Sequence, residues 1–184
     1  MVSRILIDAC VLYPTVMREI VLGAARAGLF EPIWSERIIE EWARAAIKIG
    51  PTGEMQARSE IALLHAAWPD ASRPAAPHVA QRLWLPDEND IHVLAVAVDA
   101  SADAIMTLNT KDFPRGTLAE EGVERIDPDS HLVSLWMDHP AAIEAAAADV
   151  LQTARRLSGE DWEMRPLLKK ARLPRLAKAL RTVV

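Results

Sequence analysis

The hydrophobic residues in the first part of the chain form either short unbroken runs or a helical pattern. The run from Val2 to Ile7 is apolar and rich in β-branched residues, which predicts a buried strand. After Pro14 the apolar residues recur at helical spacing as far as Gly28, so a helix is expected there. Residues 29–34 favour a short strand or a connector, because Pro32 argues against a central strand.

The next apolar segments predict two helices followed by a loop. Ser35 is a favourable N-cap for a helix that a Gly-Pro pair ends near residue 50. A second helix is expected over residues 54–68, where a proline follows it. Residues 70–86 are rich in Pro, Ala and Ser, which predicts a loop with a short strand around residues 82–85.

The second half of the chain continues the alternation and then becomes wholly helical. A helix that begins at Asn89 or Asp90 is apolar on nearly every side, so we expect it to be buried. Strands are predicted over residues 104–107 and 122–126, and helices from Pro128 to the end. Breaks in this helical part are expected at Pro140, Ser158-Gly159, Pro166 and Pro174. Because strands alternate with helices, the sequence predicts an α/β fold with a central parallel sheet and helices on both faces.

Composition limits the class of protein. A chain of 184 residues is long enough for one domain with a substantial core and an appendage. No apolar run reaches the roughly 20 residues of a membrane span, and the chain starts on a strand pattern rather than a signal segment. The single cysteine, Cys10, excludes an intrachain disulfide and a multi-cysteine zinc site. We therefore expect a cytoplasmic protein without membrane association.

The net charge of −5 is unevenly distributed along the chain. From residue 151 onward there are nine Lys/Arg and three Asp/Glu, so this tail carries +6 and the first 150 residues carry −11. An acidic body with a basic tail favours a polyanion or an acidic partner near the tail. The alternative is an ordinary solvated helical face.

Four acidic residues occupy positions that are unfavourable for folding alone. Asp8 follows an apolar strand, Asp90 opens an apolar helix, and Asp112 comes shortly after another strand. Glu41 lies at the edge of the apolar stripe of its helix, whereas Glu40 points roughly opposite. Converging carboxylates imply a cation that offsets their repulsion, and magnesium prefers such oxygen ligands. Since ligands of a doubly wound sheet bind at the carboxyl ends of its strands, the set predicts metal-dependent phosphate chemistry.

Each acid also has a structural explanation when it is taken alone. Asp8 could form a turn, Asp90 could cap its helix, Glu41 could join a surface ion pair, and Asp112 could start a loop. Two other enzyme classes fit less well. Phosphatases of the haloacid dehalogenase type need a second aspartate where Cys10 stands, and a dinucleotide-binding fold needs a glycine-rich turn after the first strand.

Four segments, taken in order, carry a resemblance to a known family. They are ILIDACVLYP at 5–14, WSERIIEEW at 34–42, LPDENDIHVLA at 85–95 and MTLNTKDFP at 106–114. They resemble PIN-domain proteins, the ribonuclease class that includes the VapC toxins of bacterial toxin–antitoxin pairs. The resemblance covers roughly residues 1–135, which we expect to be the nuclease domain, and leaves residues 136–184 as a basic helical extension.

The resemblance implies a three-layer α/β fold whose acidic cluster binds Mg²⁺, or Mn²⁺, and cleaves RNA. Asp8 matches the aspartate of the first strand, and Glu41 matches the glutamate six positions after the helix-capping serine. Asp90 matches the aspartate at the head of the following helix. These three residues are therefore expected to be catalytic and metal-binding.

The fourth acidic position departs from the family pattern. Many relatives have an acid two residues after the threonine that corresponds to Thr107, but this chain has Asn109 there. Asp112 supplies the nearby carboxylate and is expected to be the fourth catalytic and metal-binding residue. Thr107 and Asn109 are expected to bind the substrate by positioning the metal waters or the scissile phosphate. Because an acidic cluster without metal repels RNA, activity should depend strictly on the metal.

The family also implies partners. RNA is the expected substrate, a protein antitoxin is the expected partner, and a homodimer is common among relatives. Trp162, near the basic tail, is a candidate for stacking on an RNA base. The alternative is a PIN-like scaffold that binds RNA or a partner without cutting. All four carboxylate positions can be filled in this chain, so we rank the enzyme first.

Overall fold

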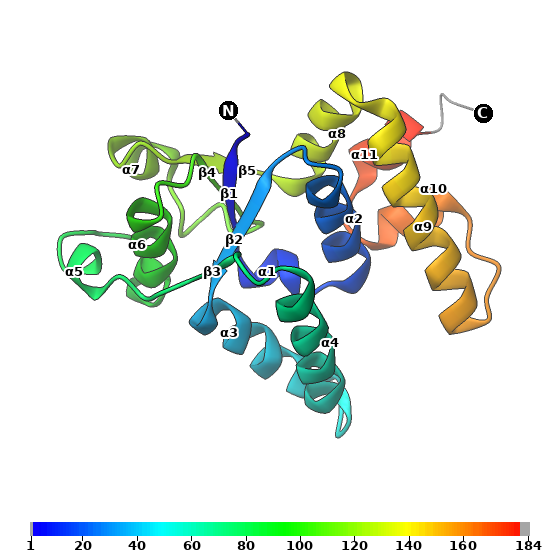
Figure 1. Cartoon of the computed structure of the whole chain (residues 1–184), viewed down its shortest axis with the longest axis horizontal. Coiled ribbons are helices and arrows are strands. Elements are labelled where there is room, and N and C mark those ends of the chain that lie inside the picture. The colour runs from blue at the N-terminus through cyan, green and yellow to red at the C-terminus, as the bar shows by residue number, and fades with distance from the viewer. Residues whose placement is uncertain (1, 181–184) are drawn as a thin grey trace. The chain divides into compact units, whose positions relative to one another are not determined.

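The computed structural model describes residues 2–180, which divide into two compact units (Figure 1). The first unit contains the chain up to Tyr13 and the segment Glu31–Ile126. The second contains Pro14–Phe30 and the chain from Asp127 onward. The expected division into a nuclease domain over residues 1–135 and a helical extension over residues 136–184 stays a prediction.

A five-stranded parallel sheet is the centre of the first unit, in the order β3-β2-β1-β4-β5. The strands are β1 (Arg4–Ile7), β2 (Glu31–Ser35), β3 (Ser72–Arg73), β4 (Ala104–Met106) and β5 (Glu124–Ile126). Strands β1 and β4 pair in register over three residues, from Ile5 with Ala104 to Ile7 with Met106. Their side chains are buried whichever face of the sheet they point to, as in parallel sheets covered on both sides. The predicted α/β fold with a parallel sheet flanked by helices is confirmed.

Within the described residues the first unit contains six helices, of which the three longest were predicted and the three short ones were not. They are α1 (Ala9–Leu12), α3 (Glu36–Ala46), α4 (Gly53–Ala67), α5 (Pro77–Ala80), α6 (Ile91–Asp99) and α7 (Arg115–Glu120), with 3₁₀ turns η1 (Ile47–Ile49) and η2 (Glu88–Asp90). The Oγ of Ser35 accepts a hydrogen bond from the backbone N–H of Ile38, so Ser35 is the predicted N-cap of α3. Helix α6 is buried along most of its length and packs against β2 and β4.

Pro32 lies inside β2, although a proline argued against a central strand. The backbone N–H of Glu31 donates to the carbonyl of Ser3, the residue before β1, so this N–H faces β1. The next nitrogen, that of Pro32, therefore faces away from β1, and β3 pairs only with Trp34 and Ser35. The missing N–H of Pro32 consequently removes no hydrogen bond from the sheet.

The prediction of a strand around residues 82–85 is wrong, because the third strand forms earlier in the chain, at Ser72–Arg73. Residues 82–85 directly follow the short helix α5, whose carbonyls hold this backbone. The N–H groups of Arg82 and Leu83 donate to the carbonyls of Val79 and Ala80. This segment is therefore tied to the end of a helix and not to the sheet.

The second unit is helical. It contains α2 (Thr15–Arg26), α8 (Pro128–Asp138), α9 (Pro140–Ser158), α10 (Met164–Lys170) and α11 (Pro174–Ala179). Three of the four expected breaks are helix boundaries, whereas Pro166 lies in the first turn of α10, where proline is tolerated. No helix within residues 2–180 is long and apolar enough to cross a membrane.

Helices α2 and α9 approach closely at Gly23. A Cβ atom added to Gly23 would lie 2.7 Å from the Cβ of Ala146, which is closer than carbon atoms pack. Gly23→Ala should therefore lower the free energy of unfolding by about 1 kcal/mol, since overpacking costs more than the better helix propensity of alanine contributes. In an Ala146→Gly background the same substitution should stabilise the protein by about 1 kcal/mol. Urea unfolding of the four proteins measures both effects, and equal effects in the two backgrounds would refute the close packing.

Candidate metal centre

The carboxyl ends of β1 and β4 bring Asp8 and Thr107 together. Because Ile7 pairs with Met106, the next residue of each strand lies at the same edge of the sheet. The N–H of Asp8 donates to the carbonyl of Met106 (3.1 Å), and the Thr107 hydroxyl donates to Oδ2 of Asp8 (2.6 Å). Asp8 is 8% exposed and Thr107 is 1% exposed. The structure thus places Thr107 as a buried support of the Asp8 carboxylate.

The carboxylate of Asp8 is held in one orientation by three donors. Its Oδ1 accepts a hydrogen bond from the N–H of Ala9 (2.7 Å) and so caps α1. Its Oδ2 accepts from Thr107 and from the thiol of Cys10 (3.1 Å). A carboxylate oxygen has two lone pairs, so Oδ1 keeps one acceptor position for a further partner.

Cys10 joins the ends of the two strands through its sulfur. Its Sγ donates to Asp8 and accepts from the N–H of Leu108 (3.3 Å) in the segment after β4. Burial, followed by the negative charge of Asp8, raises the pKa of the Cys10 thiol to about 12. The thiol therefore stays protonated at neutral pH and keeps its hydrogen for Asp8.

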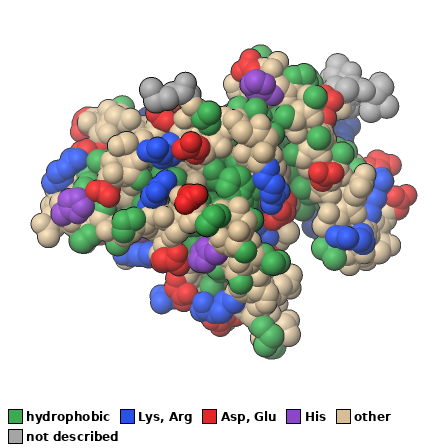
Figure 2. All heavy atoms as spheres, viewed as in Figure 1, with side chains coloured by type: hydrophobic (Ala, Val, Ile, Leu, Met, Phe, Trp, Pro, Cys, Tyr) green, Lys and Arg blue, Asp and Glu red, His purple; other side chains and the backbone are tan. Residues whose placement is uncertain are grey.

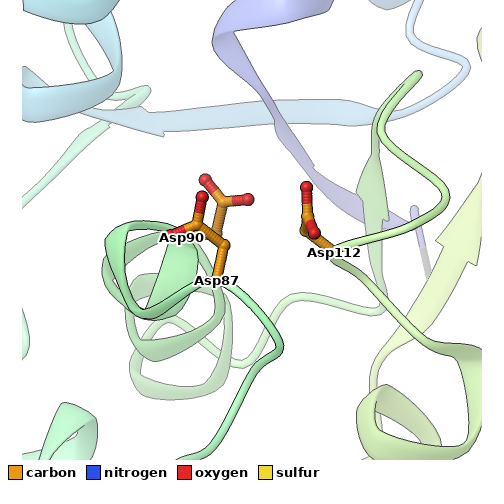
Figure 3. Close-up of side chains that lie close together, drawn as sticks. All are labelled: Asp87, Asp90 and Asp112. Carbon is orange, nitrogen blue, oxygen red and sulfur yellow. The ribbon is translucent and has the colours of Figure 1, made fainter.

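Three further carboxylates gather beside this strand edge. Asp87, Asp90 and Asp112 each contribute one oxygen, and these oxygens lie within 4.8 Å of one another. Figure 3 shows the three side chains directed to the same side, Asp87 and Asp90 from the 3₁₀ turn η2 before α6 and Asp112 from the loop after β4. All three residues are half-buried. Opposite ligands of an octahedral Mg²⁺ ion are about 4.2 Å apart, so this spacing suits a divalent ion after a small closure.

Repulsion among the carboxylates has its largest effect on Asp90. Burial, followed by the charges of four neighbours, raises the pKa of Asp90 to about 6. These neighbours are, in decreasing order of effect, Asp8, Asp87, Asp112 and Glu41. The metal-free protein therefore accumulates negative charge that a divalent cation would neutralise.

Asn109 ties Asp90 to the loop of Asp112. Its Nδ2 donates to Oδ2 of Asp90 (3.2 Å), and its Oδ1 accepts from the N–H of Asp112 (3.3 Å). The amide has only this orientation, because a carboxylate accepts and a backbone N–H donates. Both polar ends of Asn109 are thus engaged, while the carboxylate of Asp112 is directed to the cluster.

Glu41 lies outside the group of three oxygens but close enough to act on it. Its Oε1 is 2.9 Å from Nε2 of His92 and 3.4 Å from Nε of Arg37. The His92 contact is an ion pair when the imidazole is protonated. Partial burial works to raise the pKa of Glu41, but His92 and Arg37 outweigh it and lower this pKa below its usual value. Glu41 is therefore ionised at neutral pH.

Glu40, its neighbour in the sequence, belongs to the surface instead. It forms ion pairs with Arg44 and Arg58, and Arg58 also pairs with Glu54. Figure 2 shows acidic and basic side chains intermingled over α3 and α4, where these pairs lie. The two adjacent glutamates thus have different surroundings, as their helical positions predicted.

Sequence reasoning missed three residues of this region. Asp87 accepts a hydrogen bond from the N–H of Asn89 (2.9 Å) and also joins the cluster, although no site role was predicted for it. Asp87 and Asp90 are three residues apart, which puts both on one side of a helical turn, so the sequence could have indicated that they lie together. His92 and Cys10 gave no such signal, because their contacts come from other segments.

The raised pKa of Asp90 predicts a pH-dependent stability. Because the folded state holds the Asp90 proton more tightly than the unfolded state, the ionised carboxylate destabilises the metal-free protein above pH 6. Asp90→Asn should therefore raise the melting temperature at pH 8 and have little effect at pH 4, where the folded protein already carries the proton. Differential scanning fluorimetry in EDTA measures this, with the exposed Glu120→Gln as control. An equal effect at both pH values would contradict the repulsion.

Comparison with known proteins supplies the family. The sequence model of the PIN domain matches residues 4–111, which is more than half of the chain. No curated protein and no solved structure was found to match. PIN domains are generally metal-dependent nucleases, and the matched segment contains β1, β4 and all the carboxylates described above except Asp112. The chain belongs to the PIN-domain family.

Proposed function

We propose that this protein is a divalent-metal-dependent endoribonuclease that hydrolyses RNA phosphodiester bonds. The observation that carries the proposal is that carboxylate oxygens of Asp87, Asp90 and Asp112 lie within 4.8 Å of one another. Burial and the neighbouring acids raise the pKa of Asp90 to about 6, and perturbed carboxylates of this kind cluster at functional sites. The PIN-domain family supplies the reaction class, since its members are typically nucleases that use divalent ions.

The residues fit a hard cation. Every acidic side chain in the cluster offers carboxylate oxygen, which suits Mg²⁺ or Mn²⁺. The nearby Cys10 sulfur is already engaged, because it donates to Asp8 and accepts from the N–H of Leu108. The site therefore favours oxygen-preferring ions over thiophilic ones.

We assign the roles from these positions. Asp90 and Asp112, with Asp8 through its remaining acceptor position, are the proposed metal ligands, and Asp87 is added to this set. When bound, the ion supplies charge neutralisation at the phosphoryl oxygens and a more acidic attacking water. Glu41, which is ionised and close enough to act on Asp90, is the residue that would orient the attacking water.

Thr107 and Asn109 are proposed to act on the substrate through the carboxylates that they hold. Thr107 sets the direction of Asp8, and Asn109 fixes the distance between Asp90 and the loop of Asp112. Losing either support would misplace ligands without removing one. Residues that orient metal ligands in this way commonly contribute a factor of about 10–100 to activity.

Cleavage of labelled RNA tests the proposal. With Mg²⁺ or Mn²⁺ the wild type should cut, and EDTA should stop cutting. Asp8→Asn and Asp90→Asn should each lower the rate by more than about 100-fold, because they remove charge at the ligand positions themselves. Thr107→Ser should keep most of the activity, since it keeps the hydroxyl that donates to Asp8.

The exposed Glu120→Gln is the matched control, since it removes one negative charge on α7 away from the cluster. It should cut like the wild type. Intact RNA with either metal, from a folded protein that still binds RNA, would replace the nuclease with the non-catalytic binding protein.

The resemblance to VapC-type proteins supports a finer proposal. We propose that the nuclease is the toxin of a type II toxin–antitoxin pair, that it acts in the cytoplasm, and that a protein antitoxin and a second copy of the chain are its partners. Induced expression should then arrest growth, and Asp90→Asn should remove the arrest. Unimpaired growth with active enzyme present in the cells would contradict the toxin role and leave the nuclease intact.

A further inference from the structure

The last two helices of the second unit carry an unusual concentration of positive charge. Residues 164–180 contain six Lys/Arg and no Asp/Glu. All six are exposed, and they are Arg165, Lys169, Lys170, Arg172, Arg175 and Lys178. We call this set the basic face.

Helix geometry explains why the basic face points outward. In α10, Leu167 and Leu168 are buried, and the basic residues of the helix lie within about 70° of the opposite direction. In α11, Leu176 and Ala177 are buried, and its two basic residues lie within about 30° of the opposite direction. The apolar side of both helices thus packs inside the unit, and the basic side chains lie on its surface and are not needed for this packing.

The charges of the basic face are not neutralised by the protein. Some arginines elsewhere are paired, as Arg44 and Arg58 are with Glu40. None of the six basic side chains forms an ion pair with a carboxylate among residues 2–180. Arg175 donates to the hydroxyl of Ser130, which carries no charge. The face is therefore a net positive surface.

Arg172 occupies a position that would suit glycine better. It lies between α10 and α11 with φ = 64°, in the left-handed region. The N–H of Leu173 donates to the carbonyl of Leu168 across it, which is the hydrogen bond of a glycine-type helix end. A side chain in this conformation is strained, and glycine would adopt the same backbone conformation without that cost.

Lys170 is held over an aromatic ring. Its Nζ lies 4.8 Å from the centre of the Trp162 ring, and the loop of Trp162 is anchored by Arg155, whose Nε donates to the Trp162 carbonyl (2.7 Å). The ring thus fixes the direction of a lysine in the basic face. Positively charged surfaces that also carry aromatic side chains are typical of proteins that bind single-stranded nucleic acid.

We propose that the basic face binds the phosphate backbone of single-stranded RNA. The inference rests on the proposed function and adds a binding surface to it. The first unit has seventeen Asp/Glu and ten Lys/Arg, so the nuclease centre lies in a body that repels a polyanion. The basic face supplies the positive charge that such a substrate requires.

Binding to the full-length protein in EDTA tests this surface without any cleavage. Fluorescence anisotropy of a labelled 20-nucleotide RNA gives the Kd as a function of salt. Arg172→Gly removes one charge and relieves the left-handed strain, so it should leave the melting temperature equal or higher. Each phosphate contact on a single strand contributes a slope of about 0.7 in log K against log salt, so Kd should rise about fivefold at 0.1 M salt. Adding Lys169→Ala should raise it about 25-fold and lower the slope by about 1.4.

Two control variants test whether a change in Kd comes from the lower net charge, or from removing a left-handed side chain, and not from the basic face. Lys48→Ala removes one exposed charge in the first unit, and Ser101→Gly relieves the other left-handed non-glycine residue among residues 2–180. Neither should change the Kd by more than the measurement error.

An unchanged Kd for Arg172→Gly, or an equal loss for Lys48→Ala, would overturn the proposal. If Arg172→Gly weakened the binding of polyglutamate but not the binding of RNA, the basic face would be assigned to an acidic protein, and the RNA proposal would be overturned. Because the assay contains no metal, RNA binding through the basic face would stand even if the protein failed to cut RNA.

Discussion

The pairing of β1 with β4 is the constraint on which the proposed site depends. Its register puts Asp8 and Thr107 next to each other, and their 2.6 Å hydrogen bond joins the two strand ends. Cys10 repeats the connection one step further out, from Asp8 to Leu108. Asn109 then extends it to Asp90 and Asp112. The direction of each of these carboxylates thus follows from one sheet register.

The same arrangement sets stability against function. The apolar strands and α6 provide the burial that holds the first unit together, and at their edge the protein accepts repelling carboxylates. Neutral donors support these acids on the protein side, while their negative charge is directed to the cluster. In the proposed function a cation relieves this repulsion, so metal binding and folding stability should be linked.

Most of the fold could be predicted because it depends on local patterns. The strands around residues 4–7 and 104–106 and the helix after Ser35 follow from apolar periodicity and capping. The position of the third strand could not be predicted in this way. Hydrogen bonds to the end of α5 fix residues 82–85, whatever conformation their own sequence prefers. The role of Asn109 as a tie between two segments, and that of Cys10 as a donor to Asp8, depend on contacts between β4 and β1. Such contacts leave no periodic trace in a sequence.

Anomalous X-ray scattering from a crystal soaked in Mn²⁺ is the direct test of the proposed metal centre. We expect one strong peak at about 2.2 Å from carboxylate oxygens of Asp90 and Asp112, with Asp87 or Asp8 beside it. The peak should disappear in crystals of Asp90→Asn. A well-ordered crystal without a peak there, or with Mn²⁺ bound only elsewhere, would contradict the claim that these carboxylates converge to hold a divalent ion.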